Sequence, residues 1–350
     1  MASRSDGRSP GPGDAARSPG EGGGPPDGEA RRYRVYGLVV ESDFPFRTPL
    51  PETGDAPDLS FRRVWDPPVP VDWRDSEPAF ESRYLDDLGR PRIRLHRLDG
   101  LDVFRHAGVA DYYVGPDGIV CHQHDSASTP IVEVYFLSLL AGFWLETHGR
   151  LVLHGSAVSI GDRAAVFLAT NTGGKTSLAA SLMRLGHPLL TDDFLAVSLD
   201  DGVALGFPSF PQMRMWPDLA DHFADDHRDL PRVLADTEKR RVPVGTPGIG
   251  AFCPLPRPLA RLYVPFRRPA GEEGPVRIEP LSPREALLEL LRESFLRTIL
   301  ERTGLHERRF ARLAELARLV PMARLDYPSG LDRLPDVSRT IVADVSEGGA

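Results

Sequence analysis

One stretch near the middle of the chain restricts the possible folds more than any other. An apolar run, Val166-Phe167-Leu168, leads within a few residues to Gly173-Gly174-Lys175-Thr176, and Leu178, Leu182 and Leu185 then recur at helical spacing. Two glycines leave the backbone free to wrap round an anion, and the first amide groups of the following helix point at that anion. The pattern therefore predicts a strand, an anion-binding loop and a helix, as in an α/β domain.

The spacing of this loop indicates a nucleoside triphosphate, with ATP and Mg²⁺ as the expected ligands. The usual pattern is G-x-x-x-x-G-K-[ST], in which the Lys reaches the β- and γ-phosphates and the Ser or Thr ligates Mg²⁺. Ala169 replaces the first glycine. A Gly-rich turn capped by Thr176, without a ligand, is the alternative. The residues expected to contact the nucleotide are Ala169, Thr170, Asn171, Thr172, Gly173, Gly174, Lys175, Thr176 and Ser177.

Two acidic residues and a histidine extend the candidate site. Asp192-Asp193 follows the apolar run Pro188–Thr191, and Asp192 lies 17 residues after Lys175. His154 ends a strand-like run and lies 21 residues before Lys175. The carboxyl ends of strands in such a sheet face the nucleotide, so one carboxylate can hold Mg²⁺ and the other can accept a hydroxyl proton. The alternatives are a turn or helix-cap role for the Asp pair and a structural role for the histidine.

The chain divides into four parts by composition. Residues 1–32 contain no Val, Ile, Leu, Phe or Trp and predict a disordered tail. Residues 33–149 predict a smaller β-rich α+β domain that ends in a helix, and residues 150–343 an α/β domain with the phosphate loop. Residues 344–350 are expected to fray. A length of 350 residues with 41% apolar content fits two domains of this kind.

The expected elements follow from periodicity and from Pro, Gly and Asp turns. The strands expected in the first domain are Tyr33–Val40, Leu59–Val64, Arg92–Leu98, Asp102–Ala107, Asp111–Val114 and Gly118–Cys121, before a helix over Pro130–Gly149. In the second domain we expect strands at Leu151–His154, Ala157–Ile160, Ala164–Leu168, Pro188–Thr191 and Phe194–Leu199, and helices at Ser177–Leu185, Pro283–Arg302 and His306–Leu319. Pro321–Tyr327 and a Pro-punctuated segment to Val342 close the chain.

Charge and composition exclude some partners. The net charge is −8 without a dense Lys/Arg block, which favours neither nucleic acid nor an anionic membrane. The longest apolar stretch, Ile131–Leu145, contains Glu133 and is too short to span a bilayer, so we expect a buried helix. The first 32 residues hold no apolar segment of a secretory signal, and Cys121 and Cys253 form no disulfide framework. These features favour a cytoplasmic protein.

Three segments together resemble a known family. Leu153–Val158, Gly174–Thr176 and Gly186–Asp193 are similar to the catalytic domain of HPr kinase/phosphorylase and of the HPr-kinase-like serine kinases, with His154, Lys175 and Asp192 matching in order and spacing. The resemblance covers about residues 33–343 and is sharpest over 151–218. It continues in Tyr36–Leu38, Gly206–Pro208, Met213–Pro217, Lys239–Pro243 and Val320–Pro328.

The resemblance implies a fold and a set of roles. The fold would be that of the phosphoenolpyruvate carboxykinase core, a phosphate-loop fold with a mixed sheet. Lys175 would contact phosphate, Thr176 and Asp193 would ligate Mg²⁺, Asp192 would be the catalytic base, and His154 would sit near the γ-phosphate. Candidate phosphate clamps, with a solvated basic face as the alternative, are Arg214, Lys239 and Arg240.

The predicted function is an ATP-dependent kinase that phosphorylates a hydroxyl, expected to be a Ser on a peptide or small protein. The acceptor would be an HPr-like protein or the precursor of a modified peptide such as a lasso peptide. Ala169 and Ser177 depart from the true HPr kinases and leave open whether HPr is the acceptor. Two other hypotheses are a nucleotide sensor or scaffold without phosphotransfer and a metabolic enzyme of the carboxykinase type. The oligomeric state is not predicted.

Two further groups contain metal-ligating residues. Cys121-His122-Gln123-His124 lacks zinc-site spacing and an evident partner pair, so alternation at a strand end is the preferred interpretation. Asp221–His227 is typical of an acidic, solvated helix start or loop. Cys253 has no neighbouring helix N-terminus that would activate it.

Overall fold

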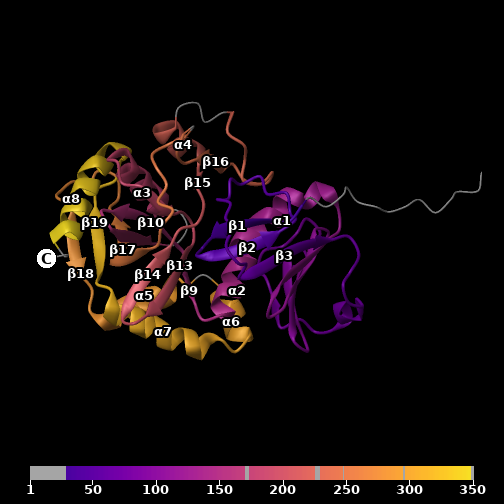
Figure 1. The fold of residues 1–350 in the computed structure, drawn as a ribbon. Helices are drawn as coiled ribbons and strands as arrows, with labels where there is room; N and C mark the ends of the chain where they lie inside the picture. The colour runs from indigo at the N-terminus through magenta and orange to yellow at the C-terminus, as the bar shows by residue number, and fades with distance from the viewer. Residues whose placement is uncertain (1–28, 170–172, 225–228, 247, 295, 348–350) are drawn as a thin grey trace, which may run out of the picture.

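The computed structural model describes residues 29–169, 173–224, 229–246, 248–294 and 296–347. These residues form a mixed α/β fold with two large sheets, one built from the chain before the long helix and the other from the chain after it (Figure 1). Residues 1–28 of the predicted tail and the last three residues lie outside the described part. Arg31 and Arg32, which the tail prediction included, already belong to the first strand.

The first sheet has eight strands in the order β1-β2-β3-β8-β7-β6-β5-β4. The pairs β2–β3 and β3–β8 are parallel and the others are antiparallel. Its strands are β1 (Arg31–Val35), β2 (Leu38–Ser42), β3 (Leu59–Val64), β4 (Phe80–Glu81), β5 (Ile93–Leu98), β6 (Leu101–His106), β7 (Ala110–Val114) and β8 (Gly118–Gln123). A short 3₁₀ helix, η1 (Asp72–Asp75), lies in the β3–β4 connection.

The single strand predicted over Tyr33–Val40 is wrong, because the chain reverses in the middle of it. Tyr36 and Gly37 both have positive φ, at 56° and 72°, and form the two-residue turn of the β1–β2 hairpin. Positive φ at both central positions suits the right-handed twist of a hairpin. The first of these positions is usually Asn, Asp or Gly, and the Tyr found there is not a residue that predicts a turn.

A continuous helical run crosses from the first sheet to the second. It consists of η2 (Ser126–Ser128), α1 (Thr129–Tyr135), the π-helical turn η3 (Phe136–Leu140) and α2 (Ala141–Thr147). The predicted buried helix is confirmed, but at 22 residues the run is long and apolar enough by composition to cross a membrane, unlike the shorter stretch expected from sequence. Glu133 is fully buried in this run and forms a 2.7 Å ion pair with Arg241, so the helix packs inside the protein.

The second sheet follows the order β12-β10-β11-β17-β14-β13-β9, with β19 added beside β17 and β18 beside β19. The pairs β11–β17 and β17–β19 are parallel, and the sheet is therefore mixed. Its strands are β9 (Leu151–Leu153), β10 (Gly155–Ile160), β11 (Arg163–Leu168), β12 (Leu189–Thr191), β13 (Leu195–Asp200), β14 (Val203–Phe207), β17 (Arg257–Arg267), β18 (Arg277–Pro280) and β19 (Met322–Tyr327). A separate pair joins β15 (Gln212–Met215) to β16 (Arg240–Pro243).

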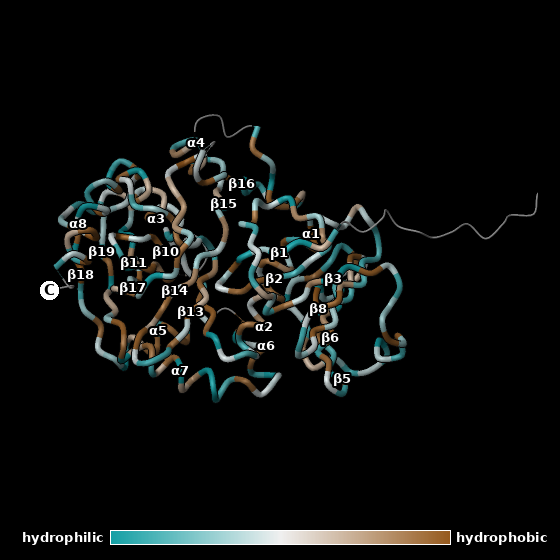
Figure 2. The backbone as a smooth tube through the Cα atoms, in the orientation of Figure 1, coloured by the Kyte–Doolittle hydropathy of each residue, from teal (hydrophilic) through white to brown (hydrophobic). Residues whose placement is uncertain are grey.

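Helices cover both faces of the second sheet. Ala165 and Phe167 of β11 pack on one face in the core that contains α3 and α8, whereas Ala164, Val166 and Leu168 pack on the other in the core of α5 and α7. Burial on both faces explains the unbroken apolar sequence of β11. Figure 2 shows hydrophobic residues concentrated along these inner strands. The helices are α3 (Lys175–Arg184), α4 (Pro217–Phe223), α5 (Pro283–Arg292), α6 (Arg297–Arg302), α7 (His306–Leu319) and α8 (Leu334–Glu347), with η5 (Leu331–Arg333) before α8.

Two predictions near the C-terminus are wrong. The helix expected over Pro283–Arg302 ends at Arg292, and α6 begins only after Leu296, whose φ of 37° interrupts the helical conformation. Helix α8 runs to Glu347 through the segment expected to fray, because Val337, Ile341 and Val345 are buried beside α3. Side-chain burial fixes this last helix, and its proline near the start suits a first turn.

Candidate functional site

The Lys175 loop connects the central strand β11 to helix α3. Ala169 follows β11 and is buried, and Gly174 precedes the first helical residue, Lys175. The strand–loop–helix arrangement expected from sequence is confirmed at both ends of the loop. Thr170, Asn171 and Thr172, which were expected to contact phosphate, lie outside the described residues.

Gly174 occupies a position that no other residue fits. Its φ is +90°, and a Cβ atom there would lie 2.5 Å from the hydroxyl oxygen of Tyr327, a buried residue at the end of β19. Glycine therefore serves two purposes: it permits the left-handed backbone and leaves room for Tyr327. The same tyrosine borders the cavity described below.

We expect Gly174→Ala to destabilise the fold more than Gly186→Ala. Gly186 has a nearly identical φ of +91°, but a Cβ atom there would meet nothing within 4 Å, so it reports the backbone strain alone, about 1–2 kcal/mol. Chemical denaturation of both variants measures the difference. Adding Tyr327→Phe to Gly174→Ala should recover part of the loss, and equal destabilisation by the two alanine variants would contradict the steric account.

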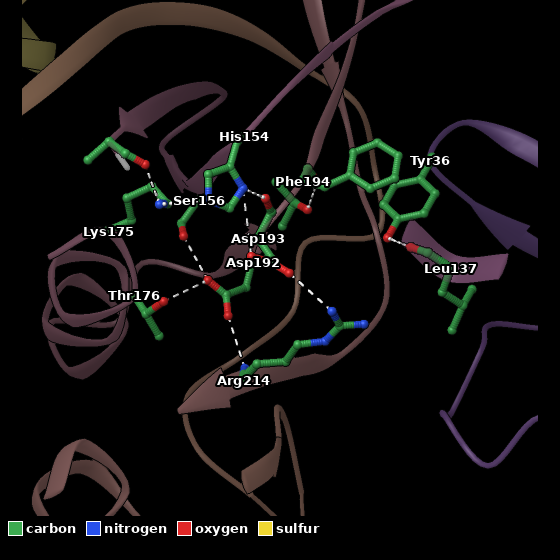
Figure 3. Close-up of polar contacts among 12 residues, drawn as sticks. Tyr36, Leu137, His154, Ser156, Lys175, Thr176, Asp192, Asp193, Phe194 and Arg214 are labelled. Carbon is green, nitrogen blue, oxygen red and sulfur yellow. Dashed lines mark hydrogen bonds and ion pairs between the residues drawn. The ribbon is translucent and has the colours of Figure 1, made fainter. Parts of the chain in front are cut away.

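Lys175 is held in place by two groups at the base of the loop. Its ammonium group donates to the carbonyl oxygen of Ala169 and to Nε2 of His154, the latter at 3.1 Å. Because an ammonium group only donates, Nε2 of His154 must accept, and the ring proton is on Nδ1, which donates to the carbonyl oxygen of Asp193 at 2.8 Å. His154 is thus a neutral ring that positions Lys175 (Figure 3). Burial lowers the pKa of Lys175.

Asp192 is the centre of a hydrogen-bonded cluster. Its Oδ1 accepts from the hydroxyl of Ser156 at 2.7 Å and from the hydroxyl of Thr176 at 3.2 Å, and its Oδ2 accepts from the backbone amide of Arg214 at 3.0 Å. The side chain is largely buried. Asp192 therefore joins α3, β10 and β15 at one point, directly beside the hydroxyl predicted to ligate Mg²⁺.

Asp193 points in a different direction from Asp192. Its φ of 75° is unusual for a residue other than glycine and turns the chain between β12 and β13. Its carboxylate forms a 3.0 Å ion pair with Arg214 and lies 3.7 Å from Nδ1 of His154. Burial raises the pKa of Asp193, but the positive charges of Arg214, Lys239 and Lys175 outweigh it, so the pKa falls below its usual value.

A contact from the first sheet supports this acidic turn. The ring of Tyr36 stacks on Phe194, the residue after Asp193, with centroids 3.9 Å apart, and its hydroxyl donates to the carbonyl oxygen of Leu137 at 2.7 Å (Figure 3). Gly37 lies against Phe207, leaving no room for a Cβ atom. The hairpin turn of the first sheet is thus packed one residue from the candidate site. The segment Tyr36–Leu38 resembled the family by sequence, but its contact with the acidic turn was not predicted.

A cavity of about 530 Å³ opens beside the loop. Its lining includes Gly173, Gly174, Thr176, Ser177 and Asp193, which were predicted from sequence. Arg267, Trp216 and Tyr327 also line it and were not predicted as site residues. Each lies at or just beyond the end of a strand, and side chains at strand ends are candidates for a site in such a sheet.

Both lysines of the chain face this cavity. The sequence contains only Lys175 and Lys239, and both are among its lining residues, as is Arg214. The amine of Lys239 lies 5.6 Å from the ring centroid of Trp216. Two of the three candidate clamps therefore reach the cavity. The third, Arg240, instead donates to the carbonyl oxygen of Leu230 at 3.2 Å.

The donor atoms at the loop fit a magnesium ion. Thr176 offers a hydroxyl oxygen, and Asp192 and Asp193 offer carboxylate oxygens, which are the ligands that Mg²⁺ prefers alongside phosphate and water. Asp192 already contacts Thr176, so two of the three groups are adjacent. All three ligands are oxygen atoms, so the set needs no sulfur or imidazole.

Two sequence candidates have other places in the fold. Residues 221–223 of the acidic segment belong to α4, Ala224 follows that helix, and 225–228 lie outside the described residues. Cys121 and Cys253 are both free thiols and both buried. Burial raises the pKa of Cys121, so this thiol is not an activated nucleophile.

Comparisons of this chain with known proteins found matches among solved structures but none among family models or curated proteins. Among solved structures, the Hpr(Ser) kinase/phosphatase from Coxiella burnetii is a neighbour with 12% sequence identity and a TM-score of 0.29. That match covers 56% of this chain and 96% of the other. The fold and site themselves define a mixed α/β protein in which Lys175, Thr176 and the carboxylate of Asp193 line one cavity, and the carboxylate of Asp192 contacts Thr176.

Proposed function

We propose that this protein is an ATP- and Mg²⁺-dependent kinase of the HPr-kinase-like type, with a phosphate loop at residues 169–176. The observation that carries the proposal is the arrangement at the start of α3, where Lys175, Thr176 and Asp193 line one cavity and Asp192 contacts Thr176. A helix N-terminus that follows a Gly-rich turn attracts phosphate, and the lysine adds a positive charge.

Lys175 supplies the phosphate contact in this proposal. Its amine donates to His154 and to the Ala169 carbonyl oxygen, and both of these acceptors are neutral. A triphosphate in the loop offers a charged acceptor, which binds an ammonium group more strongly than a neutral one. When bound, Mg²⁺ would bridge phosphate oxygens and neutralise part of their charge.

The two carboxylates have different roles in the proposal. Asp192 has both oxygens engaged by Ser156, Thr176 and the Arg214 amide, which suits a magnesium ligand next to Thr176. Asp193 lines the cavity, its side chain is 35% exposed, and it can reach an incoming hydroxyl. We assign Asp193 as the base that accepts the hydroxyl proton, which exchanges the roles implied by the family resemblance.

The acceptor in this proposal is a Ser hydroxyl on a peptide or small protein. The cavity is open and polar and carries Trp216 at its edge, 44% exposed, where an acceptor chain can pack. Lys239, Arg214 and Arg267 add positive charge there, which suits an acceptor with acidic residues near its hydroxyl.

Incubation with γ-labelled ATP and Mg²⁺ tests the kinase proposal. The acceptors are a pool of Ser-containing peptides with acidic flanks, a matched pool with Ala in place of Ser, and a purified HPr protein. We expect label on the Ser pool and none on the Ala pool. Tight ATP binding without transfer to any acceptor would instead identify a nucleotide sensor or scaffold.

A further inference from the structure

A second cluster of potential ligands lies in the first sheet, away from the Lys175 loop. Asp111 of β7 stands opposite His122 of β8 in the strand register, and His124 lies two residues further along the chain. Residues i and i+2 of a strand share a face. The neighbouring cross-strand pair, Tyr112 and Cys121, points the other way, into the core shared with α1 and α2. The sequence indicated the His pair but not the carboxylate, because only the strand pairing brings Asp111 to it.

The ligand atoms of these three residues converge. One atom of each lies within 4.8 Å of the other two. Oδ2 of Asp111 is 3.1 Å from Nε2 of His124 and 3.6 Å from Nδ1 of His122. Asp111 is completely buried, and the side chain of His122 is 11% exposed. A fully buried carboxylate requires a compensating positive charge.

The tautomer of His122 leaves a lone pair facing that carboxylate. Nε2 of His122 lies 3.1 Å from the carbonyl oxygen of Trp65, which can only accept, so the ring proton is on Nε2. Nδ1 of His122 and Oδ1 of Asp111 are both buried without a hydrogen-bond partner among the described residues. An imidazole fixed by a backbone carbonyl in this way is typical of a metal ligand.

We propose that Asp111, His122 and His124 bind a divalent transition-metal ion such as Zn²⁺. Two imidazole nitrogens and one carboxylate oxygen are a common ligand set for such ions, with one position left for water. The ion would place a positive charge between the Nδ1 lone pair and Oδ2, where no proton now lies. This site is independent of the proposed kinase function.

Without a metal, the guanidinium of Arg74 supplies the positive charge beside the Asp111 carboxylate. From η1 it forms an ion pair with Oδ2 of Asp111, and its side chain is 27% exposed, so it can turn toward solvent. Arg105 faces Asp111 from β6. Metal binding would therefore exchange one cation for another at Asp111, and removal of Arg74 should strengthen it.

Titration of Zn²⁺ into the full-length chain, in excess Mg²⁺, tests this site. Mg²⁺ occupies oxygen-rich sites such as Asp192 and Asp193 but competes poorly for imidazole. We expect one Zn²⁺ per chain by calorimetry and by metal analysis after desalting. His122→Gln and His124→Gln should each lower the affinity at least about tenfold, the loss caused even by outer-shell changes.

The controls separate a metal site from an ion-pair cluster. His306→Gln, on the exposed start of α7, should leave Zn²⁺ binding unchanged, and Arg74→Gln should raise the affinity. His124 follows the last residue of β8 and is partly exposed, so its variant should fold even if His122→Gln does not. Absence of stoichiometric binding in the wild-type chain, or binding that survives His124→Gln, would overturn the proposal. A lower affinity in Arg74→Gln would overturn the cation exchange.

Discussion

Asp193→Asn should lower the turnover number for phosphoryl transfer by roughly 10²- to 10⁴-fold, the usual contribution of a general base. The substitution keeps the size of the side chain and its contact with Arg214 but removes the proton acceptor at the cavity. ATP should still bind, because Lys175 and the loop are unchanged. Steady-state transfer to a Ser peptide, together with calorimetric ATP titration, measures both quantities.

Asp192→Asn is the matched control for this prediction. Asp192 contacts Thr176 and the Arg214 amide, so its loss should raise the Mg²⁺ concentration needed for half-maximal transfer. Transfer should recover in part at high Mg²⁺. If Asp193→Asn transfers normally, and Asp192→Asn abolishes transfer without altering Mg²⁺ dependence, then Asp192 is the base and our assignment is wrong.

Lys175→Met should have the second large effect, on both ATP binding and transfer. A hydrogen bond to a charged group contributes about 1.5–3 kcal/mol, which corresponds to roughly a 10- to 150-fold loss of ATP affinity. Loss of a positive charge that stabilises the transferring phosphate should lower turnover by about another 10²- to 10³-fold. Fold integrity should be kept, since burial already disfavours the charged amine.

Lys239→Met provides the comparison within the same cavity. The amine of Lys239 lies over the ring of Trp216, whereas the amine of Lys175 donates a hydrogen bond to His154 beside the loop. We expect a loss of affinity below about tenfold, the range of a partly screened charge. Equal effects of the two lysine variants would mean that general positive charge, and not the loop lysine, determines binding.

The sequence predicts the site more completely than it predicts the sheet. Lys175, Thr176 and the Asp pair stand at strand and helix ends that local pattern reveals, and the structure brings them together with His154. The eleven-residue strand β17, which joins β11 to β14 and β19, was not predicted. Its residues Arg257–Arg267 include two prolines and three arginines at positions that break the expected alternation. Only pairing with distant strands makes this segment extended.

Contacts between distant residues explain the remaining differences. The exchange of roles that we propose for Asp192 and Asp193 rests on the turn at Asp193, whose positive φ local sequence does not specify. The stacking of Tyr36 on Phe194 joins residues 158 positions apart. The His122 and His124 pair gains its carboxylate only through the β7–β8 register. In each case the partner is chosen by the fold, so spacing along the chain gives no signal for it.

An acyl-phosphate derivative of ATP tests the central claim most directly, because the chain has only two side-chain amines. A lysine amine near the γ-phosphate attacks the acyl carbonyl, forms an amide and releases ATP, and the lowered pKa of Lys175 favours this reaction. We predict that mass spectrometry finds the acyl group on Lys175 and that excess ATP prevents the labelling. Labelling confined to the chain's α-amine, or labelling of Lys175 that ATP does not reduce, would contradict a triphosphate site at this loop.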